Sequence, residues 1–369
     1  MSAFFYSLYY KFFALFISTL MIVSPSFRSK AERLETDKQN QLTHIEELQN
    51  AYLTVEKNEV NESSFFDGNL EEVLNSGIKF NELTYIGTHN SYQRYIGSES
   101  GIGCGGDEGG TPVNLSDQLD AGLRNLEIDI ETVVDETGTH FVCIHSPLLD
   151  MNTNCYSFEK ALEELKIWSD NNPKHLPISV IIEPKKVFVP LENMEFFSLK
   201  AANELDKRLS EILGDTLLTP SDVLGDFGSF KEMREADAWP QVRDTLGKIA
   251  VILHPCKVTD DYIKQDETIK TQSMFPMLRI ADKNRSYASF LLINDAKSLL
   301  KDSPAFADGN FVIRTRADLY GRYSETTFNT AALSAANIIS TDYPCFANCD
   351  SDKYVAFNGN KTVKVTNFR

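Results

Sequence analysis

Between residues 76 and 345 the chain alternates short apolar runs rich in β-branched residues with longer segments whose apolar residues recur every three or four positions. The short runs have the length of buried strands, and the longer segments have the period of amphipathic helices. Such alternation is typical of an α/β protein in which helices cover a parallel sheet. It predicts strands at residues 83–86, 126–130, 140–144, 178–182, 249–253, 290–293, 311–313 and 338–339. It predicts helices at, for example, residues 157–168, 196–212 and 326–336.

Eight strands alternating with helices predict a (β/α)8 TIM barrel, regular or distorted, over residues 76–345. The 369 residues of the chain exceed the roughly 250 that such a barrel needs, so further segments flank it. Residues 27–75 are polar and charged with a broken helical period, which predicts a solvated helical tether. Residues 346–369 are expected to form a tail with a short hairpin, because Asn358-Gly359 is a turn signal.

The first residues have the pattern of a targeting segment. An apolar run at residues 12–23 follows Lys11 and ends before the polar Ser24-Pro25-Ser26, which predicts a cleaved signal peptide over residues 1–26. The run is shorter than the about 20 apolar residues of a membrane-spanning helix. Aromatic residues before it offer the alternative of an uncleaved anchor. We therefore expect a secreted or periplasmic protein.

Export changes the interpretation of the six cysteines, because oxidising compartments favour disulfides. Their even number agrees with a disulfide-bonded protein, although the spacing does not single out one pairing. The alternative is that Cys143 and Cys256, in or beside apolar runs, are buried thiols. The cysteines are Cys104, Cys143, Cys155, Cys256, Cys345 and Cys349.

The net charge of −17 and the isoelectric point near 4.8 argue against a nucleic-acid partner. Proteins that bind phosphate backbones do so through clustered lysines and arginines. An acidic protein also gains little from the potential of anionic lipids, so contact with a membrane needs apolar residues or a bridging divalent cation. We expect a monomer.

Polar residues stand at or just after the carboxyl ends of several predicted strands, where the active site of a TIM barrel lies. Glu127 and Asp129 are two residues apart on one strand, so both carboxylates point to the same side. Two like charges inside a barrel need a cation. Together with Asn90 and Glu183 they form an oxygen-only set that suits Ca²⁺ and not zinc. The strand-end residues are His89, Asn90, Glu127, Asp129, His145 and Glu183.

Each of these residues also has a structural interpretation. A single histidine such as His89 is often only hydrogen bonded, and an acidic pair often faces solvent at a sheet edge. Glu183 argues for a site, because it follows a buried apolar run where an unpaired carboxylate is costly. His44, His140, His175 and His254 are not accompanied by a carboxylate pattern, so we expect structural roles for them. Cys143 and His145 do not predict zinc, because the further soft ligands are missing.

At these positions the chain resembles the calcium-dependent phosphatidylinositol-specific phospholipases C, especially the bacterial secreted type. The resemblance implies that His89 and His145 form a catalytic pair. It also implies that Asn90, Glu127, Asp129 and Glu183 hold Ca²⁺, whereas an arginine replaces the cation in the calcium-independent branch. The matching segments are Gly87-Thr88-His89-Asn90-Ser91-Tyr92, Leu126-Glu127-Ile128-Asp129, His145-Ser146-Pro147 and Ile182-Glu183-Pro184-Lys185. Supporting segments are Arg314-Thr315-Arg316-Ala317-Asp318 and Ser340-Thr341-Asp342-Tyr343-Pro344.

The implied reaction is attack by the inositol 2-hydroxyl on phosphorus, which releases diacylglycerol from the headgroup of phosphatidylinositol at a transient membrane surface. Glu127 or Glu183 would take the hydroxyl proton. His89 would stabilise the charge on phosphorus, and His145 would protonate the leaving oxygen. Lys185, Arg314 and Asp342 are expected to contact the phosphate or the inositol, with a salt bridge at the barrel rim as the alternative for all three.

Two other functions fit part of the pattern. A glycerophosphodiester phosphodiesterase also combines a barrel, calcium and two histidines, but its first histidine is followed by arginine, and here Asn90 follows His89. A non-catalytic barrel that binds inositol phosphates or membranes is the second alternative, although such proteins normally lose the catalytic residues that this chain keeps.

Overall fold

The computed structural model describes residues 25–54, 59–93, 113–145, 151–185, 193–318, 322–345 and 353–368. The predicted export signal lies almost entirely outside these residues, as do Cys104 and Cys349. Within the described ranges, no helix combines the length and the apolar character needed to cross a membrane.

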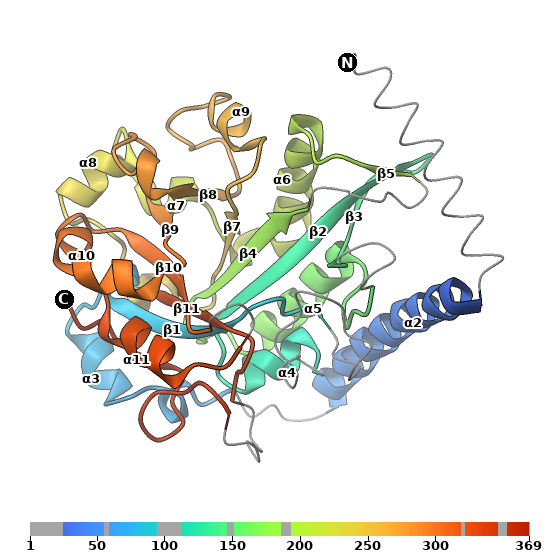
Figure 1. Ribbon diagram of the computed structural model, residues 1–369, viewed down its shortest axis with the longest axis horizontal. Helices are drawn as coiled ribbons and strands as arrows, with labels where there is room; N and C mark the ends of the chain where they lie inside the picture. Colours follow the sequence, from blue (N-terminus) through green and yellow to red (C-terminus); the bar gives the residue numbers. More distant parts are fainter. Residues whose placement is uncertain are drawn as a thin grey trace.

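The predicted barrel is confirmed: eight parallel strands follow one another around it, and the last of them pairs with the first (Figure 1). The carboxyl ends of all eight strands therefore lie at one end of the barrel. In order the strands are β1 (Leu83–Thr88), β2 (Asn125–Asp135), β4 (Ile178–Pro184), β7 (Ile249–Leu253), β8 (Phe275–Arg279), β9 (Phe290–Leu292), β10 (Val312–Arg316) and β11 (Ile338–Thr341).

One predicted strand is not part of the barrel, and one barrel strand was missed. The run predicted at residues 140–144 forms β3 (Gly138–Val142), which pairs antiparallel with the outer half of β2. β2 is long enough to leave the barrel after Ile130 and form this hairpin. β8 escaped detection because it contains Pro276 and no β-branched residue, so it lacks the usual pattern of a strand.

Helices surround the strands (Figure 1), and several begin directly after a serine whose side chain caps them. Ser157, Ser198 and Ser324 each accept a hydrogen bond from the backbone N–H three residues later. The helices are α3 (Leu70–Asn75), α4 (Leu115–Asp120), α5 (Phe158–Asn171), α6 (Leu199–Leu213), α7 (Pro220–Leu224), α8 (Phe230–Glu235), α9 (Thr259–Ile263), α10 (Ala296–Asp308) and α11 (Glu325–Leu333).

Alternate residues of the barrel strands pack into two different hydrophobic cores. Leu126, Ile128 and Ile130 of β2 pack in a cluster that includes residues of α5 and α6. Ile181, Ile252, Met277, Val312 and Ile338 belong instead to a second cluster with Phe80 and Trp239, whose rings stack 5.7 Å apart. The second set fills the inside of the barrel. Residues two positions further along these strands therefore also point inward, at the carboxyl end.

Residues 25–54 form α2 (Pro25–Thr54), a helix as predicted, but it packs on the barrel and is not a solvated tether. Leu34 and Ile45 are buried, and Gln41 exchanges hydrogen bonds of 2.9 and 2.8 Å with the backbone of Ser157. Nε2 of His44 lies 3.1 Å from Oε1 of the buried Glu164 on α5. The face of α2 that packs on the barrel is half polar, so the apolar residues of this segment do not by themselves mark a buried face.

The C-terminal segment adds a strand to the barrel wall. The turn predicted at Asn358-Gly359 is present, with Gly359 at φ 68° and a bridge between Phe357 and Lys361. β12 (Val363–Val365) then pairs antiparallel with the start of β1.

Three cysteines of the described residues carry free thiols. Cys143 and Cys155 are buried, and Cys256 is partly exposed. The buried-thiol alternative therefore describes Cys143, and Cys256 is unpaired but not fully buried.

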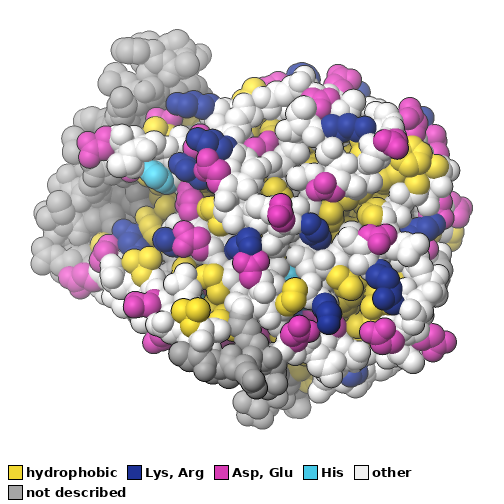
Figure 2. All heavy atoms as spheres, turned by 180° about the vertical axis from the view of Figure 1, so that it is seen from behind, with side chains coloured by type: hydrophobic (Ala, Val, Ile, Leu, Met, Phe, Trp, Pro, Cys, Tyr) yellow, Lys and Arg dark blue, Asp and Glu magenta, His cyan; other side chains and the backbone are white. Residues whose placement is uncertain are grey.

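Charged side chains of both signs intermingle on the face of the molecule seen in Figure 2, so neither sign forms a broad patch there.

Candidate active site

The turn after β1 brings His89 and Asn90 into the mouth of the barrel. A Cβ atom on Gly87 would lie 2.5 Å from Cβ and 2.7 Å from the carbonyl oxygen of Asn125, so only glycine lets β1 and β2 approach here. His89 then donates its backbone N–H to Thr341 on β11, at 2.9 Å. Asn90 has φ 49°, a left-handed conformation that asparagine tolerates better than most residues, and its side chain is buried.

His89 sits between two carboxylates. Its Nδ1 atom lies 2.6 Å from Oδ1 of Asp342, and its Nε2 atom lies 3.7 Å from Oε1 of Glu127. Arg316 approaches from β10, with Nη2 3.2 Å from the same Nδ1 atom. Asp342 is fixed by its backbone N–H, which donates to Asp318. Asp342 therefore contacts His89, and its expected contact with substrate stays a prediction.

Glu127 is buried in an ion pair with Arg314, and Oγ of Ser340 lies 3.2 Å from Oε2 of the same carboxylate. Burial alone would raise the pKa of Glu127, but the Arg314 guanidinium, with His89, holds that pKa well below its ordinary value. The Arg314 side chain is only 3% exposed. The alternative of a rim salt bridge is therefore wrong for Arg314, which is buried in its ion pair with Glu127, and its expected contact with the phosphate or the inositol stays a prediction.

Asp129, Glu183 and Lys185 form a second ionic group. Nζ of Lys185 lies 2.9 Å from Oδ2 of Asp129 and 3.2 Å from Oε1 of Glu183, and the Tyr92 hydroxyl donates to Asp129 at 2.7 Å. Burial raises the pKa of Asp129, and the nearby Glu183 adds to this rise. Burial opposes ionisation of Glu183 too, but Lys185 outweighs it and lowers that pKa.

Two oxygens of the predicted metal ligands are buried without a hydrogen-bond partner among the described residues. They are Oδ1 of Asn90 and Oδ1 of Asp129. Unpaired buried oxygens are costly, and a divalent cation with oxygen ligands would satisfy both. The donor set therefore fits Ca²⁺. In the described part of the chain, however, no three acidic, histidine or cysteine side chains already surround one point.

His145 lies on a different kind of element from the other predicted site residues. It follows β3 by three residues, on the hairpin that leaves the barrel, and it is partly exposed. The neighbouring Ile144 packs with Leu34 of α2 and Met151 in a small core of its own. His145 is therefore carried by an arm beside the barrel and not by a barrel strand.

Sequence reasoning missed His254 and Glu131. His254 follows β7, and its backbone N–H donates to Ile182 at 2.9 Å. Burial lowers the pKa of His254, against the opposing effects of Glu183 and Glu127, so its ring lies in the same electrostatic environment. The sequence could have indicated the inward position of His254, because it comes two residues after the inward Ile252, just as Glu183 comes two residues after Ile181.

Glu131 continues the row of Glu127 and Asp129 on β2 and is 2% exposed. Burial, with the neighbouring Asp129, raises the pKa of Glu131 to about 8. The two-residue spacing would have identified it as a third carboxylate on the same face of β2, just beyond the barrel.

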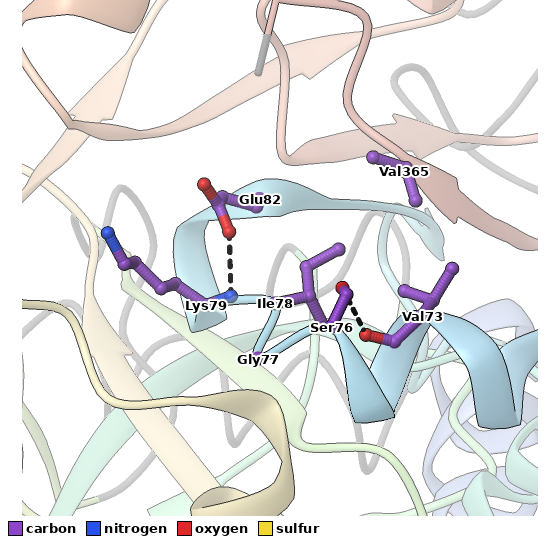
Figure 3. A pocket seen from close by; sticks show the side chains of 7 residues that line it. All are labelled: Val73, Ser76, Gly77, Ile78, Lys79, Glu82 and Val365. Atoms are coloured by element: carbon purple, nitrogen blue, oxygen red, sulfur yellow. Dashed lines mark hydrogen bonds between the residues drawn. The ribbon is translucent and has the colours of Figure 1, made fainter.

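A separate hollow of about 360 Å³ lies at the other end of β1 (Figure 3). It is lined by Val73, Ser76, Gly77, Ile78, Lys79, Glu82 and Val365. Glu82 immediately precedes β1, whereas His89 follows its last residue, so this hollow is not part of the candidate active site.

Three solved structures that resemble this chain come from bacteria. The apo calcium-dependent phosphoinositol-specific phospholipase C of a Pseudomonas species is 17% identical, with a TM-score of 0.57 over 83% of this chain and 99% of that one. Its myoinositol complex is 18% identical, with a TM-score of 0.57 over 82% and 98%. The Ca²⁺-dependent phosphatidylinositol-specific enzyme of Streptomyces antibioticus is 19% identical, with a TM-score of 0.55 over 72% and 95%. At these identities the likeness establishes the fold. No curated protein matches the chain.

A family model described as "Phosphoinositide phospholipase C, Ca2+-dependent" matches residues 139–367, more than half of the chain. The match includes His145, Glu183, Lys185, Arg314 and Asp342, and it begins after His89, Asn90, Glu127 and Asp129. The chain therefore belongs to the Ca²⁺-dependent phosphoinositide phospholipase C family.

Proposed function

We propose that this protein cleaves the bond between diacylglycerol and phosphate in phosphatidylinositol, in a reaction that depends on calcium. The observation that carries the proposal is the position of His89, whose ring is braced by Asp342 on one side and faces Glu127 on the other. This pairing stands beside the unpartnered oxygens of Asn90 and Asp129. A phosphate bound there would meet a histidine and a cation together.

Calcium would be held by Asn90, Glu127, Asp129 and Glu183. The oxygen-only donor set and the calcium dependence of the family support this assignment. When bound, the ion supplies positive charge to the phosphate oxygens and lowers the pKa of the attacking hydroxyl.

Glu183 is the better candidate to accept the proton of the 2-hydroxyl. The pKa values of both carboxylates are lowered, that of Glu127 by Arg314 and that of Glu183 by Lys185, so access decides between them, and the Glu127 side chain is only 2% exposed. The Glu183 side chain is 30% exposed at the mouth, where a hydroxyl can reach it. Glu127 then serves mainly as a ligand.

His89 and His145 would act on different atoms of the phosphate. Because Asp342 engages Nδ1, the Nε2 atom of His89 is directed to the side where Glu127 lies. There it would donate to a phosphate oxygen as negative charge develops. His145, on the arm beside the barrel, would protonate the departing diacylglycerol oxygen.

Two of the predicted substrate contacts take on other roles in this proposal. Arg314 orients Glu127, and Asp342 orients His89. Arg316 is better placed to meet the phosphate than Arg314, since its side chain is 23% exposed beside His89. Lys185 remains a substrate contact.

We also propose that the protein is exported, works as a monomer at a membrane surface and carries one disulfide, which includes Cys345. The apolar run at residues 12–23 supports export, and the three cysteines besides the free thiols leave room for a single intramolecular disulfide.

Product analysis on phosphatidylinositol vesicles tests the proposed reaction. With Ca²⁺ we expect diacylglycerol and a cyclic inositol phosphate, and with excess chelator neither. Activity restricted to the deacylated glycerophosphoinositol would instead favour a glycerophosphodiesterase. Full turnover in chelator, with bound metal excluded by elemental analysis, would contradict the proposal. His89→Ala serves as the inactive control.

A further inference from the structure

The ammonium group of Lys185 lies between two carboxylates that the proposed function assigns to calcium. Asp129 and Glu183 are direct neighbours in the pairing of β2 with β4. Lys185 follows Glu183 by two residues, and its backbone N–H donates to Ile130 at 2.9 Å. The Nζ distances of 2.9 Å to Asp129 and 3.2 Å to Glu183 follow from this register.

The ammonium neutralises charges that would otherwise repel each other. The Asp129 side chain is fully buried and that of Glu183 is 30% exposed. The Nζ atom is within ion-pair distance of both carboxylates, and lysine is ordinarily a cation. Lys185 is therefore a cation in a place where a bound metal ion would also need to be.

Both cations cannot share these oxygens. An ion coordinated by Asp129 and Glu183 at the usual 2.3–2.6 Å would stand within a few ångströms of the ammonium and repel it. The four-carbon stem of lysine is flexible, so Nζ can leave while the backbone stays in place. The Lys185 side chain is 22% exposed, which gives it a route toward solvent at the barrel mouth.

We propose that Lys185 is an exchangeable counterion of the calcium site. It holds Asp129 and Glu183 together in the metal-free protein, and Ca²⁺ displaces it toward the mouth, where the substrate phosphate binds. This inference rests on the proposed function, because it takes the same oxygens as calcium ligands.

Calcium titration by calorimetry, without substrate, tests the competition. Lys185→Met removes the competing charge and keeps the length of the stem, so we expect it to bind Ca²⁺ about tenfold more tightly than the unmodified protein. Lys185→Arg should bind no more tightly than the unmodified protein. Lys174→Met is the matched control, because Lys174 is 81% exposed and 4.0 Å from Glu59, and its loss should change affinity less than about twofold.

Lysine labelling of the unmodified protein provides a second readout that needs no variant. Reductive methylation followed by mass spectrometry should show Lys185 protected without Ca²⁺ and several-fold more reactive with it. Lys79 is the internal control, since it pairs with Asp237 and lines the hollow at the far end of β1. Its labelling should not respond to Ca²⁺.

The outcomes separate the two ideas. If Ca²⁺ binds equally to the unmodified protein and to Lys185→Met, or binds without changing the labelling of Lys185, the exchange is refuted and the proposed function stands. If Ca²⁺ binds to none of these proteins, both the exchange and the proposed metal site are refuted.

Discussion

The Nδ1 atom of His89 lies 2.6 Å from Oδ1 of Asp342. The two residues follow neighbouring strands, β1 and β11, whose backbones are also joined by the bond from His89 to Thr341. Asp318 secures the backbone of Asp342 in turn. The orientation of the His89 ring is therefore set by the closure of the barrel, where its first and last strands meet.

Asp342→Asn should lower kcat about 10²-fold while KM and calcium affinity stay close to those of the unmodified enzyme. The neutral amide binds Nδ1 of His89 more weakly than the carboxylate does, so the ring is no longer held in the orientation that the phosphate needs. Steady-state kinetics on phosphatidylinositol measure the effect. Asp302→Asn, on the exposed surface of α10, is the control. A loss confined to KM would mean that Asp342 binds substrate, as the sequence predicted.

The two histidines that we propose as catalytic, His89 and His145, should respond differently to the leaving group. His145→Ala is expected to cost about 10²-fold or more with natural lipid, but far less with an aryl phosphoinositol, whose leaving group needs little protonation. His89→Ala should impair both reactions, because charge develops on phosphorus whatever group leaves. Equal losses for both variants on both substrates would refute the division of roles, and recovery of His89→Ala alone would reverse it.

Arg314→Met should lower the free energy of unfolding by about 3–5 kcal/mol, because it leaves the Glu127 carboxylate buried without its partner. Urea denaturation in the presence of chelator measures this loss. Arg285→Met removes an exposed ion pair with Asp282, at 3.5 Å, and should change stability by less than about 0.5 kcal/mol. An unchanged urea midpoint for Arg314→Met would show that Glu127 is not held as described.

Gly87→Ala should destabilise the protein by about 1–3 kcal/mol and reduce activity, because the added methyl group meets the backbone of Asn125 and separates β1 from β2. Thermal unfolding and kinetics would follow both effects. Gly228→Ala is a suitable control, since the nearest neighbour of an added Cβ is the end of the Glu232 side chain, at 3.0 Å, and not backbone. Equal behaviour of the two variants would contradict the close approach at Gly87.

The buried carboxyl group of Glu131 should make the stability of the protein depend on pH. Its pKa is raised to about 8 in the folded protein, so the folded state keeps a proton that the unfolded state releases above about 4.5. Stability should therefore fall by a few kcal/mol, relative to Glu131→Gln, as the pH rises from about 5 to about 8, and the difference should then level off. Unfolding of both proteins in chelator across this range measures the difference. Parallel curves would show that Glu131 is not desolvated.

The alternation of apolar runs and helical segments was enough to predict the barrel, because each inner strand is buried on both faces and is therefore almost wholly apolar. The pattern could not distinguish a barrel strand from β3, because an apolar run does not show which strand it will pair with. It also passed over β8, where packing inside the barrel compensates for Pro276 and the absence of β-branched residues.

The acidic row on β2 could be predicted from its two-residue spacing, whereas the partners of those acids could not. Arg314 reaches Glu127 only because the closed barrel brings β10 to face β2. The positions of the two residues in the sequence do not indicate that their side chains meet. His254 was set aside for the lack of a neighbouring carboxylate in the sequence, but its carboxylates come from other strands.

The hairpin of β2 and β3 has a consequence for how substrate preference can change. Because the arm leaves the barrel after Ile130, its length and sequence can vary without shifting the register of any barrel strand. Under the role proposed for His145, the end of the site that meets the lipid portion can thus be remodelled by insertion or exchange, while the strand ends around His89 stay constant. We expect natural divergence, and the most productive engineering of new leaving groups, to concentrate in the arm around His145.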